Sequence, residues 1–222
     1  MMRICLHTFC AVLSALTALG ALPALAAVCA APEIARVDLR LVDPTPKVVR
    51  SSSLHQINSK AKAHGLLKRG NLVLGLTQSE VETSMNIQFR GFKQDGRTCL
   101  TVRHVDARFG HRALTVQVPR EYALGSCQYT TVLKHEMEHV RVNREGVRKY
   151  AKLLKRELEK ALIRFNPRQV NSMKRGQAEA QRVLQNVVTQ VTTQFYKEIN
   201  TLHASIDKPG GPYDASGACR NW

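Results

Sequence analysis

The chain has 222 residues, of which 33 are Lys or Arg and 17 are Asp or Glu, so its formal net charge is +16. This charge favours anionic partners, but aromatic residues make up only 5% and barely interleave with the basic run, so a nucleic-acid stacking platform is not indicated. No internal repeat or low-complexity segment appears, which excludes repeat architectures.

The first 26 residues are interpreted as a signal peptide. Met1-Met2-Arg3 is a positive start, an apolar stretch runs to about Leu22, and Ala24-Leu25-Ala26 is a small-residue cleavage site. A membrane anchor is the alternative, since the stretch is nearly long enough to span a bilayer, but the cleavage site favours removal. We expect the mature chain, residues 27–222, to be a single domain that is secreted or periplasmic and has no transmembrane anchor.

The mature chain keeps four cysteines: Cys29, Cys99, Cys127 and Cys219. An even number in an oxidising compartment predicts two disulfides, for which three connectivities are open. A bond between Cys99 and Cys127 would pin the motif-bearing helix to the sheet. The alternative is that these two cysteines pair with Cys29 and Cys219. Because no two cysteines have C-x-x-C spacing, a zinc site built from them is not expected.

Residues 27–127 are predicted to form a β-rich half. Strands are expected at residues 37–41, 85–89, 98–105 and 113–118, and a short helix within 53–68. Asp95-Gly96 predicts a hairpin turn between the second and third strands. Gly110-His111 is a candidate turn into the fourth strand.

Residues 128–207 are predicted to form a helical hairpin. Ser126 can cap a first helix, which keeps one apolar face at a three-to-four spacing. Asn166-Pro167 ends this helix, because proline disfavours helix at the residue before it. The two helices are expected at about 127–165 and 168–206, with a tail at 208–222. The expected fold class is α+β, with a small β-sheet in the N-terminal half packed on a long antiparallel helical hairpin.

The first helix carries the motif His-Glu-Met-Glu-His at residues 135–139. His135 and His139 are four residues apart, which places two imidazoles on one helix face as ligands for zinc. Glu136 is rotated by about 100° from His135, so its carboxylate can reach a water on the metal rather than the metal itself. The motif therefore predicts one zinc ion per chain, with Glu136 as general base.

The hairpin narrows the choice of a third metal ligand. If the turn centres on Asn166-Pro167, positions near 137 face positions near 196, with several residues of slack. The residues there with metal-binding side chains are Glu198, His203 and Asp207, of which we favour His203. Tyr196 and Tyr213 are candidates to stabilise an oxyanion, and ordinary packing is the alternative for both. Residues 113–118 are a candidate edge strand for binding an extended peptide.

The motif resembles the zincin superfamily of metallopeptidases, in which a helix carrying H-E-x-x-H lies against a β-sheet. Aligned on His135, the further glycine and histidine of the metzincins fall on Val142 and Glu145, so the chain lacks the metzincin pattern. The layout is similar to the bacterial family DUF922 of predicted secreted zinc-dependent proteases. In that family the second helix ends in an aromatic residue and aspartate, and this chain has Ile206-Asp207 there.

The resemblance implies a zinc metallopeptidase with a polypeptide substrate. Two alternatives stay open: a non-catalytic basic helical-hairpin protein of the envelope that binds metal or nothing, and a zincin-like amidase of cell-wall amides. The excess of basic residues between Arg141 and Arg168 is a candidate docking surface for an anionic envelope surface, and a solvated helix face explains it equally. No specific nucleic-acid binding is expected.

Overall fold

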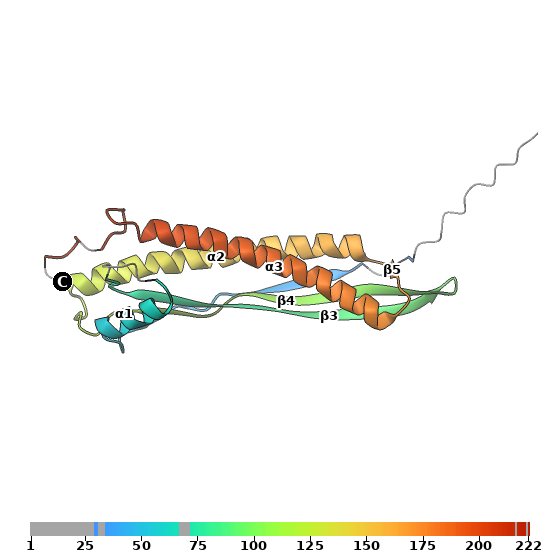
Figure 1. Ribbon diagram of the computed structural model, residues 1–222, viewed down its shortest axis with the longest axis horizontal. Coiled ribbons are helices and arrows are strands. Elements are labelled where there is room, and N and C mark those ends of the chain that lie inside the picture. Colours follow the sequence, from blue (N-terminus) through green and yellow to red (C-terminus); the bar gives the residue numbers. More distant parts are fainter. Residues whose placement is uncertain (1–28, 31–33, 67–71, 216, 221) are drawn as a thin grey trace, which may run out of the picture.

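A long antiparallel β-hairpin and a long helical hairpin lie against each other along the length of the molecule (Figure 1). The computed structural model describes residues 29–30, 34–66, 72–215, 217–220 and 222. The predicted signal peptide at 1–26 lies outside these residues.

The β-hairpin is made of β3 (Leu76–Gln94) and β4 (Arg97–Gln117). Asp95 and Gly96 join the strands with φ angles of 50° and 74°. Positive φ at both residues is the geometry that a two-residue hairpin turn requires, so the predicted turn is confirmed. The strands expected at 98–105 and 113–118 are parts of the single strand β4.

Gly110 does not turn the chain, so the turn predicted at Gly110-His111 is wrong. Gly110 lies inside β4, in register with Val42, with a φ of 150°. A Cβ atom there would lie 1.9 Å from the carbonyl oxygen of Val42. The glycine is needed because the end of a neighbouring strand passes too close for any side chain.

β4 is the central strand of a five-stranded sheet. β3 lies along one edge of β4, while parallel β1 (Arg36–Val42) and β2 (Lys47–Val49) and antiparallel β5 (Arg168–Gln169) share the other. Of residues 113–118, a candidate edge strand for peptide binding, 113–117 belong to this central strand, so that expectation is wrong. Among the described residues, β4 is paired along both edges, whereas β1, β2, β3 and β5 each pair with β4 alone.

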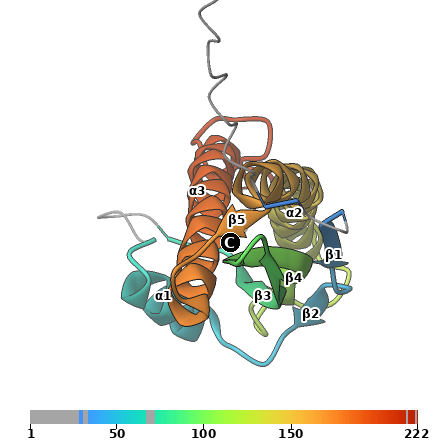
Figure 2. The same ribbon diagram turned by 90° about the vertical axis from the view of Figure 1, so that its right-hand side faces the viewer.

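The helical hairpin consists of α2 (Cys127–Phe165) and α3 (Met173–Ile206). Ser126 caps α2 by accepting a hydrogen bond from the amide of Tyr129, as predicted. α3 begins later than expected, because residues 168–169 join the sheet and Ser172 caps the helix instead. Seen end on, both helices lie on one face of the sheet (Figure 2), and the predicted α+β fold class is confirmed.

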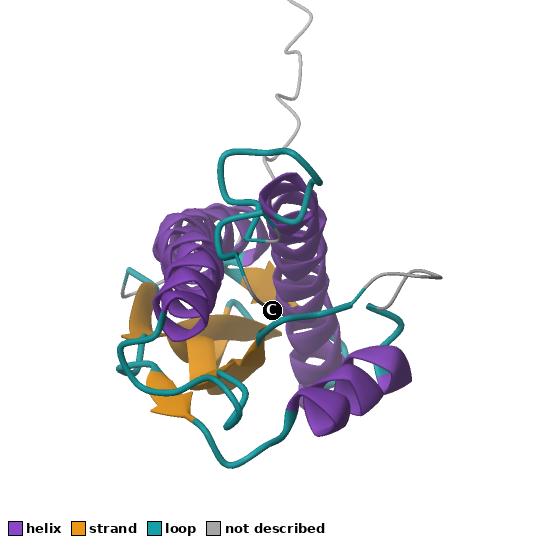
Figure 3. Cartoon of the chain, turned by 90° about the vertical axis from the view of Figure 1, so that its left-hand side faces the viewer, coloured by secondary structure: helices purple, strands orange, loops and turns teal. Residues whose placement is uncertain are grey.

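The core lies between the helices and the sheet. It contains fully buried apolar side chains from β4, α2 and α3, among them Leu100, Val102, Phe109, Leu154, Leu158, Leu184 and Phe195. α1 (Leu54–Ala63) lies at the end of the molecule where α2 starts and α3 finishes (Figure 3). In the described part of the chain, no helix combines the length and the apolar character needed to cross a membrane.

The two disulfides are Cys29–Cys99 and Cys127–Cys219. The prediction of two bonds is confirmed, whereas the Cys99–Cys127 pairing that we considered is wrong. Cys29–Cys99 ties the N-terminal segment to the start of β4, and Cys127–Cys219 ties the C-terminal tail to the first residue of α2. Two disulfides indicate an oxidising compartment.

Several basic side chains of α2 are neutralised within the molecule. Asp43, in the β1–β2 loop, accepts hydrogen bonds from Arg144 and Arg148 and is only 11% exposed. Burial opposes its charge, but the two guanidinium groups hold the pKa of Asp43 below its usual value. Further pairs join Arg141 to Glu138 and Glu145, Lys149 to Glu198, and both Arg156 and Lys160 to Glu157.

Gly146 of α2 is buried against α3. A Cβ atom on Gly146 would lie 2.4 Å from Cδ1 of Ile199 and 3.1 Å from Cε2 of Phe195. Since both partners are buried, neither side chain has free space to move into. Because Gly146 has no side chain, α3 can pack closely against α2 at this position, and this fixes the position of α3 along α2.

Replacing Gly146 by Ala should destabilise the protein, although alanine is the better helix former by about 1 kcal/mol. Overpacking against Ile199 should cost about 1–3 kcal/mol, measurable by denaturant unfolding. Ile199→Val removes the clashing methyl group, so the double variant should lose less stability than the two single variants summed. Additive losses would contradict a direct contact.

Asp43→Asn should cost about 2 kcal/mol at pH 7, because two charged hydrogen bonds lose their carboxylate. The folded-state pKa of Asp43 is lowered, so its contribution is complete above the unfolded pKa of about 3.9 and disappears as the pH falls below that value. The variant should therefore show a weaker fall in unfolding free energy between about pH 4 and 2. Asp38→Asn is the matched control and should change little, because its half-exposed carboxylate pairs with Arg36 and His104 near the surface.

Candidate metal centre

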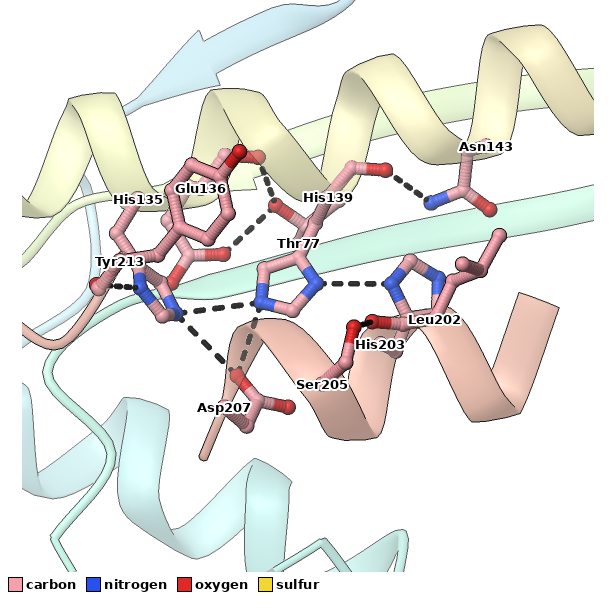
Figure 4. A network of polar contacts seen from close by, with 10 residues as sticks. All are labelled: Thr77, His135, Glu136, His139, Asn143, Leu202, His203, Ser205, Asp207 and Tyr213. Atoms are coloured by element: carbon pink, nitrogen blue, oxygen red, sulfur yellow. Dashed lines mark hydrogen bonds and ion pairs between the residues drawn. The ribbon is translucent and has the colours of Figure 1, made fainter. Parts of the chain in front are cut away.

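The end of the helical hairpin brings the motif of α2 opposite the last turn of α3 (Figure 4). His135 and His139 lie one turn apart on α2 and point the same way. Asp207 is the C-cap residue of α3, and His203 lies one turn before it. Because the helices run antiparallel, His135 lies opposite Asp207 and His139 lies opposite His203.

Three side-chain atoms converge on one point. Nε2 of His135 and Nε2 of His139 are 3.2 Å apart, and Oδ1 of Asp207 lies 3.3 Å from the first and 3.0 Å from the second. These three residues form a group that could hold a metal ion. The edges of a tetrahedron around zinc with bonds of about 2.05 Å are about 3.3 Å long, so the triangle fits one face of such a site.

The chemistry of the three atoms also fits a cation. A carboxylate oxygen and the lone pairs of two imidazoles repel one another at this separation unless a proton or a metal ion lies between them. Burial opposes a charge on His135, but contacts with Asp207 and the Tyr213 carbonyl raise its pKa to about 9. Burial also opposes the charge of Asp207, yet the two histidines hold its pKa well below the usual range.

Hydrogen bonds at the far side of each ring fix which nitrogen faces the centre. Nδ1 of His135 donates to the backbone oxygen of Tyr213 at 2.8 Å, so in the neutral ring the lone pair of Nε2 faces the centre. Nδ1 of His139 lies 2.8 Å from Nδ1 of His203. Burial and the neighbouring His139 lower the pKa of His203 to about 4, so the neutral ring can accept this proton. Such outer contacts are typical of metal-binding histidines.

Glu136 lies beside the triangle in a closed, buried position. Its Oε2 accepts a hydrogen bond from the hydroxyl of Thr77 at 2.7 Å, and Glu136 is only 4% exposed. Burial raises the pKa of Glu136, while His139, Thr77 and His135 act in the opposite direction. The start of β3 covers it so closely that a Cβ atom on Gly75 would lie 2.7 Å from Oε1.

The α3 candidates for a third ligand have separate positions. Asp207 contributes the third converging atom, whereas His203, the residue favoured from the sequence, contacts the outer side of His139. Glu198 lies further along α3 and accepts hydrogen bonds from Lys149 and Tyr150. Position 137 was expected to face position 196, but the motif instead faces residues 203–207 of α3. The reason is that β5 and its flanking residues lengthen the connection between the helices.

The two candidate oxyanion donors, Tyr196 and Tyr213, differ in how they relate to the site. Tyr213 reaches the centre through its backbone oxygen, a role that a side-chain search does not detect. Tyr196 is 45% exposed and packs beside Phe195.

Sequence reasoning missed three further residues of the site: Thr77, His111 and Asn143. Asn143 donates to the backbone oxygen of His139, and Nε2 of His111 contacts the backbone oxygen of Asn143. Burial lowers the pKa of His111. Asn143 is one turn beyond His139 on the apolar face of α2, which was the one available signal. Thr77 and His111 come from β3 and β4, and no spacing links them to the motif.

No family model, curated protein or solved structure matches this chain. Its function is therefore inferred from the geometry and chemistry of the site.

Zinc titration of the purified mature protein should show one ion per chain. His139→Ala should abolish binding, because it removes a converging nitrogen. Asp207→Asn should weaken binding strongly, because it replaces a charged carboxylate oxygen by a neutral amide. His203→Asn should weaken binding by about 10–100-fold, as expected for an outer contact. Glu198→Gln is the matched control, and a loss of zinc in that variant would show that the third ligand is wrongly assigned.

Proposed function

We propose that this chain is a secreted zinc-dependent metallopeptidase, as its resemblance to the zincins and to the DUF922 proteases implies. The observation that carries the proposal is the position of Glu136. It is a buried carboxylate beside a His-His-Asp triangle, and its charge interacts with both histidines. A site that only bound a metal would not need this extra carboxylate.

The triangle of His135, His139 and Asp207 would hold the ion. Bound zinc would supply Lewis acidity, polarising a carbonyl and lowering the pKa of water. Glu136 then accepts a proton from the attacking water and delivers it to the leaving amine. Thr77 orients this carboxylate through its hydrogen bond, and the start of β3 shields it from bulk solvent.

The exposure of the three ligands indicates where a substrate enters. The side chain of Asp207 is 57% exposed, whereas those of His135 and His139 are 17% and 10% exposed. The site is therefore open on the side of Asp207 and closed on the side of the sheet. A polypeptide approaching from the open side would reach Asp207 before it reaches the buried Glu136.

Glu136→Gln should reduce hydrolysis of a general protein substrate by about 10³-fold or more, because glutamine cannot accept the proton. Zinc content should be unchanged, since Glu136 is not a ligand. Glu138→Gln is the matched control on the same helix; it removes only an exposed ion pair with Arg141 and should keep full activity.

Retained peptidase activity in Glu136→Gln would contradict the mechanism. Zinc binding without hydrolysis by the wild-type protein would favour the metal-binding alternative. Peptidoglycan is assayed in parallel with the protein substrate, because hydrolysis of cell-wall amides alone would favour the amidase alternative.

A further inference from the structure

The segment that follows α3 completes the metal centre. We call residues 208–220 the C-terminal tail. The tail contributes the backbone oxygen of Tyr213, which accepts the Nδ1 proton of His135 at 2.8 Å. This contact is the one that turns Nε2 of His135 toward His139 and Asp207. Unlike the other outer contacts of the site, which come from helices or strands, it comes from an irregular segment.

The tail's own hydrogen bonds are local. They join residues three or four positions apart, such as Gly211 to Lys208 and Asp214 to Gly211. Bonds of this range shape the turns of the tail but do not fix its place on the rest of the molecule. Packing of Tyr213 against the main core and the buried side chain of Ala215 contribute to that place.

A covalent bond ties the tail to α2. Cys219 is bonded to Cys127, the first residue of the helix that carries the motif. Further contacts gather at the same point: the sulfur of Cys219 lies 3.7 Å from the hydroxyl of Thr131, and that of Cys127 lies 3.5 Å from the oxygen of Ala218. The tail is therefore attached to α2 about two turns before His135.

The two disulfides differ in their exposure to solvent. Cys29 and Cys99 are 5% and 0% exposed, which places their bond inside the fold. Cys127 is exposed and Cys219 is partly exposed. A thiol reagent in solution can therefore reach the Cys127–Cys219 bond and not its counterpart, and exposed disulfides are the more readily reduced.

We propose that the Cys127–Cys219 disulfide controls metal affinity by holding the tail so that Tyr213 orients His135. Opening this bond leaves the tail held by noncovalent contacts, among them the packing of Tyr213, Ala215 and Trp222. The hydrogen bond to His135 is then weakened, and the metal is held less tightly. This inference rests on the metal site of the proposed function. It makes metal retention dependent on an oxidising compartment.

The redox step is a thiol–disulfide exchange with a dithiol reductant. One thiolate of the reductant attacks a sulfur of the Cys127–Cys219 bond and forms a mixed disulfide. The second thiol of the reductant then displaces the protein sulfur and closes its own disulfide. Two electrons and two protons pass to the protein, which ends with two free thiols.

The test compares zinc affinity in three forms of the mature chain: wild type, Cys127→Ser/Cys219→Ser and Cys29→Ser/Cys99→Ser. The third form is the matched control, because the two bonds span 92 and 70 residues and constrain the unfolded chain to a similar degree. A general loss of stability should therefore appear in both variants, and a loss of affinity only in the first. We expect that variant to bind zinc about 10–100-fold more weakly.

Two further measurements keep the test decisive. Mild dithiol treatment of the wild type should reproduce the loss of affinity after the reductant has been removed without air, because dithiols themselves bind zinc. Circular dichroism should show the helices intact, so the test does not depend on a variant that fails to fold. Hydrogen exchange should rise in the peptides of residues 208–220 after reduction, in the metal-free protein as well.

The outcomes separate this inference from the proposed function. Equal affinity in the Cys127/Cys219 variant and the wild type would overturn the inference and leave the metallopeptidase intact. An equal loss in both disulfide variants would also overturn it, because the effect would then be one of general stability. Absence of zinc binding by the oxidised wild type would overturn both.

Discussion

The seating of α3 on α2 is the constraint on which the rest of this molecule depends. Two long helices can slide past each other by whole turns with little change in buried apolar area, since their apolar faces are continuous. Gly146 removes this freedom, because Ile199 and Phe195 fill the space that its side chain would occupy. With that contact fixed, His139 must face His203, and His135 must face Asp207 one turn further on.

The candidate metal centre lies where three separately positioned elements meet. α2 supplies the two imidazoles and the carboxylate of Glu136, the end of α3 supplies Asp207, and the start of β3 covers Glu136 through Gly75 and Thr77. Regular elements hold most of these groups, which keeps the converging atoms within coordinating distance of one another. The C-terminal tail is the exception, because it is irregular and a disulfide bond holds it in place.

The strong positive charge has a partly internal explanation. Ion pairs with Asp43, Glu138, Glu157 and Glu198 occupy many of the basic groups along α2, and the pair with Asp43 also fastens the β1–β2 loop to the helix. Unpaired, this density of like charge would repel itself along one helix. The charge therefore contributes to the way the helical hairpin and the sheet are joined, in addition to any role at a surface.

The sequence by itself determined the local features: the α+β class, the cap at Ser126, the end of α2 at Asn166, the turn at Asp95-Gly96, and the placement of His135 and His139 on one helix face. Each of these depends on residues a few positions apart, and their spacing is visible in the chain. The tertiary structure alone decided the disulfide pairing, the central position of β4, the placement of Asp207 rather than His203 in the triangle, and the part played by Thr77 and by the backbone of Tyr213. These depend on how far a connection carries the chain before it returns, and on close packing between residues distant in sequence, which no local spacing records.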